Sequence, residues 1–446
     1  MNISLVVPDF LSGTSFLQQP LDFLYIAHFL DTQGHNVNIV DCRVRHYSFV
    51  TMFDYLQESD LIVVTTTPSD QVQNYYLDFR YAYSVLTINN IKSKFPNTLL
   101  VVCGAHATVR PDLVFKEVKA DILIIGEIFG TLSILVSVLS SSKNYNLVPN
   151  IAYRVDETYI FTESDEFVKH PAIPNDIIPA YDKVEMSKYF GVQYKHNIPL
   201  RKLNRAVVQG GRGCPFSCKF CHNFYGSRIQ RRSPECILTE LSICQNQYGV
   251  KEIFFLDEVF TLDKDWVISL CELIQRYKIH LELTIQTRAD LLDKELLSSM
   301  YKAGVKNIWI GVESASNEIL NISSKNLDVE TILYAIEIIR SNNIEPHAFF
   351  MLGMPGESVG TLNTTIRRIY EYKLPYTRSI MICTPRYGTE YYKLALKQYP
   401  DIQKHWFSLN AIKGLVANEM TPTILQKAKT LLKKRDFVYA NECPQI

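Results

Sequence analysis

The stretch Val207–Phe224, with the sequence VVQGGRGCPFSCKFCHNF, determines how the rest of the chain is interpreted. Its cysteines, Cys214, Cys218 and Cys221, follow the spacing C-x3-C-x2-C directly after a short apolar run. Glycines and a proline surround the first cysteine, which predicts a loop and not a packed helix or strand. Thiolates so close in sequence can surround one metal centre, so we expect these three residues to be metal ligands.

The number of cysteines limits the kind of centre. Structural zinc sites and most iron–sulfur clusters take four protein ligands, but the next cysteine, Cys236, lies fifteen residues beyond Cys221. Three ligands on a four-iron cluster leave one iron open to bind another molecule. The alternatives are a zinc site, which would need a fourth ligand, and three unrelated buried cysteines.

The spacing, with the aromatic Phe220 directly before the third cysteine, resembles the radical S-adenosylmethionine (SAM) superfamily. In that family three thiolates hold a 4Fe–4S cluster, whose open iron binds the amino and carboxylate groups of SAM. One electron from the cluster then cleaves SAM and yields a 5′-deoxyadenosyl radical. The resemblance therefore implies a 4Fe–4S cluster on Cys214, Cys218 and Cys221, with SAM as a second cofactor.

The composition of the 446 residues is that of a globular protein, with 47% hydrophobic and 21% charged residues. Lys plus Arg equals Asp plus Glu, 46 each, which argues against broad nucleic-acid binding. The start of the chain lacks the pattern of a signal peptide, and the most apolar long window, 122–139, is interrupted by Glu127 and two glycines. The ten cysteines fit metal ligation in a reducing compartment better than a disulfide framework. We expect a cytoplasmic protein without nucleic-acid or membrane partners.

Residues 1–140 alternate short apolar runs with helical patterns, which predicts a Rossmann-like, doubly wound parallel sheet. The expected strands are 3–7, 37–40, 60–65, 99–103 and 121–125. Ligands of such sheets bind at the carboxyl ends of the strands. Small, hydroxyl and polar residues at these ends let a large ligand approach the backbone. They are Pro8, Asp9, Phe10, Thr65, Thr66, Thr67, Gly104, Ala105, His106, Ala107, Gly126 and Glu127.

This domain resembles the cobalamin-binding domain that precedes the radical module in many radical SAM enzymes, those of the class B methyltransferase type. The pieces VVCGAHATVRP (101–111) and ADILIIGE (120–127) support the resemblance. The usual Gly-Gly pair is Gly104-Ala105 here, and no D-x-H-x-x-G motif marks a histidine as a lower ligand of cobalt. The resemblance implies cobalamin, bound without such a histidine by the strand-end residues from Thr65 onward. A sheet of this type without a cofactor is the alternative.

Residues 141–200 are expected to form a linker. Strands at 151–155 and 159–162 form a predicted hairpin, and three prolines between 171 and 179 predict an extended connector. A covering strap is the expected role of its segment 179–190. At the other end of the chain, residues 401–446 are expected to form a helical extension with an amphipathic helix over 421–437.

Residues 201–400 again alternate strands and helices, which predicts a partial (β/α)6 barrel of the TIM type with polar residues at strand ends. The pieces FFLDEVFT, TRADLL, GVESAS and GMPGE also resemble the radical SAM family. The chemistry of the residues suggests that Asp257 and Glu258 accept from the ammonium of SAM. Roles suggested for the other strand ends are pairing of Arg288 with the SAM carboxylate, bonding of Glu313 to ribose hydroxyls, and contact of Gly353, Met354 and Pro355 with adenine.

Each of these residues also has a structural alternative. The acids could cap helices, Arg288 could pair with Asp290 or Glu313, and the glycines after residue 352 could form only a turn. A lone Cys383 near the expected site is more often part of a core.

The function implied by the resemblance is cobalamin-dependent radical methylation of an unactivated carbon, in a small-molecule or peptide natural product. It would require an external one-electron reductant of the flavodoxin or ferredoxin type. One alternative is a non-methylating radical reaction, such as cyclisation, rearrangement or oxidation. Another is a non-catalytic iron–sulfur protein, although electron transfer does not need a polar substrate cavity.

Overall fold

The computed structural model describes residues 1–8, 17–45, 49–67, 78–156, 158–195, 198–372, 380–405 and 422–433. Asp9, Phe10 and most of the expected C-terminal extension lie outside these ranges. The chain divides into two compact units. The first unit comprises Met1–Val208 and Phe224–Glu252, and the second comprises Gln209–Asn223 and Ile253–Ile446.

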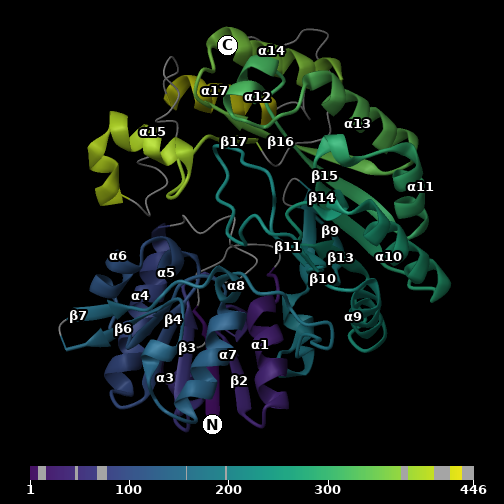
Figure 1. The fold of residues 1–446 in the computed structure, drawn as a ribbon. Helices are drawn as coiled ribbons and strands as arrows, with labels where there is room; N and C mark the ends of the chain where they lie inside the picture. Colours follow the sequence, from purple (N-terminus) through teal and green to yellow (C-terminus); the bar gives the residue numbers. More distant parts are fainter. Residues whose placement is uncertain are drawn as a thin grey trace. The chain divides into compact units, whose positions relative to one another are not determined.

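The first unit contains a seven-stranded sheet in the order β2-β1-β3-β4-β5-β6-β7 (Figure 1). The strands are β1 (Asn2–Val7), β2 (Asn36–Asp41), β3 (Leu61–Thr65), β4 (Leu99–Cys103), β5 (Ile122–Ile124), β6 (Ile151–Val155) and β7 (Thr158–Phe161). The first five are parallel, so the predicted doubly wound sheet is confirmed. In this order the chain reverses direction across the sheet between β1 and β3, where such folds bind ligands.

The predicted hairpin is present, but it belongs to the first sheet and not to a free connector. Strand β6 pairs antiparallel with β5, and β7 pairs antiparallel with β6. The hairpin therefore covers the edge that β5 would otherwise expose, as expected for a sheet edge that needs a partner.

The helices of the first unit follow the strands as the hydrophobic pattern predicts. They are α1 (Leu21–Thr32), α2 (Cys42–Arg45), α3 (Phe49–Asp54), α4 (Asp78–Lys94), α5 (Ala105–Val109), α6 (Pro111–Glu117), α7 (Ile128–Leu139), α8 (Glu166–Lys169) and α9 (Pro234–Asn246). A second hairpin, β8 (Gly191–Lys195) and β9 (Ile198–Leu203), lies in the expected linker. Residues Ala105–Ala107, expected in a strand-end loop, instead begin α5.

The second sheet has six strands in the order β10-β13-β14-β15-β16-β17. They are β10 (Arg205–Val208), β13 (Glu252–Phe255), β14 (Glu282–Thr287), β15 (Val305–Glu313), β16 (Glu345–Leu352) and β17 (Ile380–Ile382). Strands β14 to β17 pair in parallel and in sequence order, so the predicted partial barrel is confirmed. Its strand ends therefore meet at one edge, where barrel enzymes place their active sites.

The helices of the second unit are α10 (Lys264–Arg276), α11 (Lys294–Lys302), α12 (Asn317–Ile322), α13 (Val329–Ser341), α14 (Val359–Glu371), α15 (Glu390–Gln398) and α17 (Pro422–Lys433). Side chains of the preceding residues cap five of them: Asp263 for α10, Asp293 for α11, Asp328 for α13, Ser358 for α14 and Thr389 for α15. Such caps fix where each strand-end loop stops. No helix in the described part of the chain is long and apolar enough to cross a membrane.

Candidate functional site

The cysteine loop, residues 209–223 of the second unit, is held in shape by its own hydrogen bonds. The backbone N–H of Cys221 donates to the carbonyl of Cys218 at 3.0 Å. The side-chain amide of Asn223 donates to the carbonyl of Cys214 at 2.6 Å. The positions from which the three thiols project are therefore set by the backbone of the loop.

Lys219 anchors the same loop to two helices of the unit. Its backbone N–H donates to the carbonyl of Ser323 at 3.0 Å, and its ammonium donates to the carbonyl of Ile322 at 2.9 Å. Its own carbonyl accepts from the backbone N–H of Tyr391 on α15, at 3.3 Å. The loop is thus attached to the end of α12 and to the start of α15.

Solvent exposure separates the motif cysteines from the other cysteines that the structure describes. Cys214 and Cys218 are half-buried and Cys221 is exposed. The remaining six described cysteines are buried, and none of the nine forms a disulfide: Cys42, Cys103, Cys236, Cys244, Cys271 and Cys383. Only the motif thiols are therefore accessible to a cofactor among the described cysteines.

Charged side chains surround these thiols. Burial raises the pKa of Cys214, and the negative charges of Glu258 and Cys218 raise it further. Burial also raises the pKa of Cys218, whereas the cations Lys325 and Arg288 lower it. Acidic and basic groups from several strand ends therefore converge on the cysteine loop, as the sequence predicted for the barrel edge.

The donor set fits an iron–sulfur cluster better than one zinc ion. Within the described ranges, no three His, Cys, Asp or Glu side chains lie close enough together to hold a single metal ion. Zinc draws its ligands tetrahedrally round one point. The ligand sulfurs of a cluster stand on separate irons, and three accessible thiols spaced along a pinned loop fit that requirement.

Of the two strand-end acids after β13, Asp257 supports the loop, and the charge of Glu258 raises the pKa of Cys214. Asp257 is 1% exposed, and its carboxylate accepts from the backbone N–H of Gly210 at 2.8 Å. A Cβ on Gly210 would lie 2.7 Å from the ring of Trp266, so only glycine allows this approach. Glu258 is the acid whose charge acts on Cys214.

The planar guanidinium of Arg288 forms hydrogen bonds mainly to other residues of the protein. It donates to both carboxylate oxygens of Asp290, at 3.0 and 3.1 Å, and to the carbonyls of Lys325 and Asn326. Its guanidinium carbon lies 3.8 Å from the ring centre of Phe216 in the cysteine loop. The structural alternative of a pair with Asp290 is therefore present, and the bidentate fork is already occupied.

Glu313 pairs with a residue that the sequence analysis did not single out. The ammonium of Lys325 donates to its carboxylate at 3.1 Å, with both side chains about nine-tenths buried. Glu313 has a φ of 65°, unusual for a residue other than glycine, at a register shift of β15. Such local strain concentrates at functional sites.

Gly311 makes the space in which this ion pair lies. A Cβ there would lie 2.6 Å from the carboxylate of Glu313 and 2.7 Å from the ammonium of Lys325. Real contacts of this kind are longer, so any larger residue would push the two charged groups away. The pair is therefore seated directly on the backbone of β15.

The GMPGE segment forms a turn around a buried carboxyl group. The backbone N–H of Gly353 donates to Glu357, which is 1% exposed, and burial raises the pKa of this carboxyl to about 7. Met354 is fully buried in a hydrophobic cluster with Cys383 and Tyr391. Pro355 is also buried. The segment is thus a well-packed turn beside the cysteine loop, and its role toward adenine stays a prediction.

The first unit has its own pocket, here called the sheet pocket, at the carboxyl ends of its parallel strands. It has an empty volume of about 420 Å³. Its lining includes five of the residues predicted from the sequence: Thr65, Thr67, Gly104, Gly126 and Glu127. The other lining residues are Pro20, Asp22, Phe23, Cys103, Ile128 and Phe224. Thr66, Ala105, His106 and Ala107 are not among the lining residues.

Hydroxyl groups hold two strand ends of this pocket together. Thr67 accepts from the backbone N–H of Ala105 at 2.7 Å. Gly104 has a φ of 105°, and a Cβ there would lie 2.7 Å from the hydroxyl oxygen of Thr66. His106 is 2% exposed, with its ring 4.6 Å from that of Tyr81, so it packs inside the unit. Thr66 and Ala105 therefore contact lining residues of the pocket, and His106 packs inside the unit without lining it.

The sheet pocket has the chemistry of a site for part of a large, amide-rich ligand. The carboxylates of Asp22 and Glu127 supply acceptors, and glycine backbone at positions 104 and 126 permits close approach. Cobalamin carries primary amides round its corrin ring, and these donors suit such acceptors.

The cysteine loop and the strands that follow it match a known family model. Residues 208–369 match the model of the Radical SAM superfamily. The chain therefore carries a radical SAM domain. The resemblance inferred from the sequence is confirmed, and so is the expectation of a radical SAM enzyme.

Curated relatives of this chain carry two kinds of name. An uncharacterized methyltransferase of Pyrococcus horikoshii is 26% identical over 425 residues, covering 92% of this chain and 86% of the relative. An anaerobic magnesium-protoporphyrin IX monomethyl ester cyclase of Rubrivivax gelatinosus is 26% identical, covering 82% of this chain and 65% of the relative. The names thus include both a methyltransferase and a cyclase.

The fold of most of the chain is similar to that of a solved enzyme. The radical SAM methyltransferase TsrM from Kitasatospora setae has a TM-score of 0.70 at 16% identity, covering 89% of this chain and 76% of TsrM. That structure contains tryptophan and a SAM analogue, and another structure of TsrM contains cobalamin and a 4Fe–4S cluster. At this identity the likeness establishes the arrangement of elements only.

Sequence reasoning missed Lys325 because it looked for site residues at strand ends. Lys325 follows the short helix α12, between Ser324 and Asn326, which both have positive φ. The run Ser-Ser-Lys-Asn is a signal for a turn, since asparagine tolerates positive φ and serine hydroxyls form hydrogen bonds to the turn backbone. Its nearness to Glu313 in the chain was a further hint.

Proposed function

We propose that the protein is a cobalamin-dependent radical SAM methyltransferase acting on an unactivated carbon of a small molecule or peptide. The observation that carries the proposal is the pinned loop of three accessible cysteines beside the buried Glu313–Lys325 pair. A separate sheet unit with a strand-end pocket supports a second cofactor. When bound, the cluster supplies one electron that cleaves SAM, and cobalamin carries a methyl group.

Different residues of the chain would hold the cluster and SAM. Cys214, Cys218 and Cys221 would hold the cluster. Lys325 is suited to the carboxylate of SAM, since its ammonium lies in reach of the cysteine loop and the fork of Arg288 is occupied. Glu313 would then accept from the ribose hydroxyls.

Two of the earlier site residues enter the proposal with adjusted roles. We propose Glu258 for the ammonium of SAM, because its charge acts on Cys214, and Asp257 as support for the loop. A one-electron reductant of the flavodoxin or ferredoxin type and a reducing, cytoplasmic location stay part of the proposal. Nine free cysteines among the described residues support the latter.

A second candidate is a radical reaction without methyl transfer. The observation that favours it is the similarity to a relative named as a cyclase over 82% of this chain. Both candidates share the cysteine loop and the sheet pocket, so these features do not separate them. A purely electron-transferring protein is less well supported, since it has no need for a strained, buried ion pair beside the cluster.

Anaerobic reconstitution with iron, sulfide and hydroxocobalamin, followed by incubation with SAM, candidate substrates and dithionite as the one-electron reductant, tests the proposal. A methylated product together with S-adenosylhomocysteine would support methyl transfer. 5′-Deoxyadenosine without a methylated product would support the second candidate. Absence of both, in protein that holds its cluster and is offered a range of small molecules and peptides, would count against radical catalysis.

A further inference from the structure

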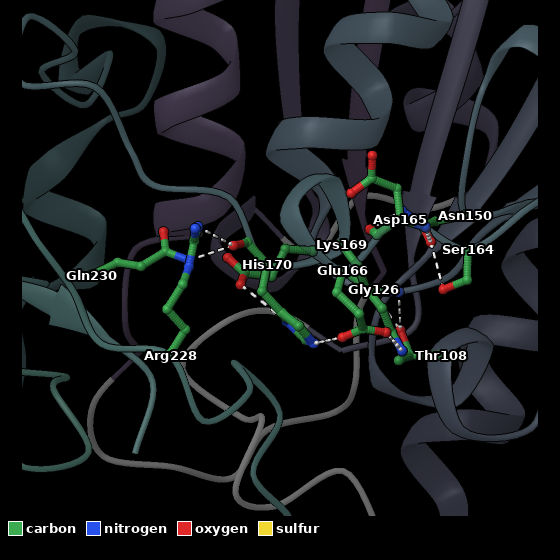
Figure 2. A network of polar contacts seen from close by, with 11 residues as sticks. Thr108, Gly126, Asn150, Ser164, Asp165, Glu166, Lys169, His170, Arg228 and Gln230 are labelled. Atoms are coloured by element: carbon green, nitrogen blue, oxygen red, sulfur yellow. Dashed lines mark hydrogen bonds and ion pairs between the residues drawn. The ribbon is translucent and has the colours of Figure 1, made fainter. Parts of the chain in front are cut away.

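The segment Glu163–His170, here called the clip, lies between the β7 hairpin and the proline-rich connector and is fastened to the first sheet. Asn150 is its main fastening point. The side-chain amide of Asn150 donates to the carbonyl of Asp165 at 2.8 Å, and its oxygen accepts from the backbone N–H of Asp165 and the hydroxyl of Ser164 (Figure 2). The carbonyl of Asn150 accepts from the backbone N–H of Ile125, at the end of β5. The clip is therefore a fixed part of the first unit.

The clip contacts the lining of the sheet pocket through the backbone. The carbonyl of Lys169 accepts from the backbone N–H of Glu127 at 3.0 Å. A Cβ on Gly126, which has a φ of 106°, would lie 2.9 Å from that same carbonyl oxygen and closer still to the side chain of Lys169. On its other side, Gly126 donates to the hydroxyl of Thr108 at 2.9 Å (Figure 2). Only glycine therefore fits at position 126, where the clip contacts the lining of the sheet pocket.

His170 ends the clip and brings its imidazole to Glu127. Its Nδ1 lies 3.5 Å from the carboxylate of Glu127, and its Nε2 lies 3.6 Å from the carboxylate of Glu166. The side chain of Glu127 is 3% exposed, whereas that of Glu166 is 67% exposed. The two imidazole nitrogens therefore face one buried pocket carboxylate and one solvated carboxylate.

The remainder of the first unit holds His170 in this position. Its backbone carbonyl accepts from the side chains of Gln230 and Arg228 (Figure 2). A Cβ on Gly226 would lie 3.0 Å from the imidazole ring, so this glycine lets the ring lie against the backbone. Lys169 pairs with Glu166 at 3.2 Å. The imidazole is thus confined from several sides.

We propose that His170 is a positioning residue of the sheet pocket, and that through its Nδ1 it holds the Glu127 carboxylate ready to accept from amide donors of the ligand. A carboxylate has about four acceptor positions, so a partner on one side leaves acceptor capacity toward the pocket. An imidazole N–H that faces a buried carboxylate offsets part of the cost of burying that carboxylate, which gives His170 its physical role. This inference rests on the proposed function, because the ligand with such amides is cobalamin.

The test compares the binding of hydroxocobalamin by the wild-type protein, with its cluster, and by three His170 variants. Asparagine can place an N–H donor near the position of Nδ1, and glutamine can place one near the position of Nε2. We expect His170→Asn to bind within about threefold of wild type. We expect His170→Gln and His170→Ala to bind about tenfold or more weakly, because neither places a donor near the position of Nδ1 to hold the Glu127 carboxylate.

Glu166→Gln is the matched control, since it removes the other partner of His170 and keeps the ring. Its cobalamin affinity should equal that of wild type, and all variants should keep the thermal midpoint and iron content of wild type. Equal affinity in all three His170 variants would overturn the inference, and so would His170→Asn binding as weakly as His170→Ala. If wild-type protein with its cluster takes up no cobalamin, the proposed cobalamin dependence fails as well, which separates the two failures.

Discussion

The ammonium of Lys325 lies 3.1 Å from the carboxylate of Glu313, and both groups lie directly over Gly311. This ion pair is buried next to the cysteine loop, where a positively charged sulfonium with a zwitterionic amino acid end would have to bind. Either charge is costly to bury alone. A charged group of SAM can therefore replace Lys325 as the partner of Glu313, or Glu313 as the partner of Lys325. SAM would then bind without leaving either charge buried alone.

The first prediction concerns this pair. Lys325→Met and Glu313→Gln should weaken SAM binding by about ten- to a hundredfold, the cost of one charged hydrogen bond. Neither residue supplies a thiolate, so the iron content should stay unchanged. Equilibrium binding of SAM to reconstituted protein measures the effect. Lys306→Met is the control, because Lys306 lies over the ring of Tyr301 and away from Glu313. Equal losses in the control would show that the effect is general.

Gly311→Ala should act on the same pair without removing a charge. The new Cβ would displace the Glu313 carboxylate or the Lys325 ammonium, so SAM affinity should fall while the cluster is retained. Gly360→Ala is a matched control in helix α14, where a Cβ meets only an ordinary contact at 3.5 Å. That change should raise stability by about 0.5–1 kcal/mol, since alanine favours helix over glycine. An unchanged SAM affinity in Gly311→Ala would mean that the position of the Glu313–Lys325 pair against Gly311 does not contribute to SAM binding.

The cluster assignment makes a third prediction. Cys214→Ala, Cys218→Ala and Cys221→Ala should each lose iron and the broad visible absorption of the cluster, because three thiolates are the minimum for holding it. Cys236→Ala, Cys244→Ala and Cys271→Ala should keep both, since these thiols are buried in helices. Full iron content in any variant of the first group would refute the assignment.

Glu357 provides a prediction about pH. Its folded pKa of about 7 lies above the ordinary value of 4.5, so the folded state holds the proton more tightly than the unfolded chain does. The stability that this proton contributes is fully present below pH 4.5 and is lost as the pH rises through about 7. The loss should approach about 3 kcal/mol, at ~1.4 kcal/mol per pH unit.

Glu357→Gln should remove this dependence, because an amide stays neutral and still accepts from Gly353. Denaturant unfolding at pH 5 and pH 8 should show a smaller difference between the two conditions in Glu357→Gln than in wild type. Glu345→Gln, at an exposed position of β16, should behave as wild type. A wild-type stability that rises over the same interval would contradict the sign of this effect.

Much of the fold was predictable because it depends on local patterns. The apolar runs of β1, β3 and β4 mark buried parallel strands, and the cap residues Asp293 and Ser358 mark helix starts. The cysteine loop was recognisable for the same reason, since all its ligands lie in eight consecutive residues.

The choice of partners was less predictable, because it depends on contacts between distant segments. Arg288 had three possible partners in the sequence analysis, and the structure pairs it with Asp290. His170 stood in the expected linker, and its position against Glu127 follows from the attachment of the clip at Asn150. Amino-acid composition and hydrophobic periodicity contain no information about such contacts.

The difference in solvent exposure between the cysteines allows the cluster content of a preparation to be measured by thiol labelling. An alkylating reagent added to the folded apoprotein should reach Cys214, Cys218 and Cys221 before the six buried thiols of the described chain. Atmospheric oxidation should damage the same three first. Thiolates bound to iron are shielded from both reactions. The fraction of molecules that resist labelling, counted by mass spectrometry, therefore reports the share of a preparation that carries a cluster before any turnover is measured.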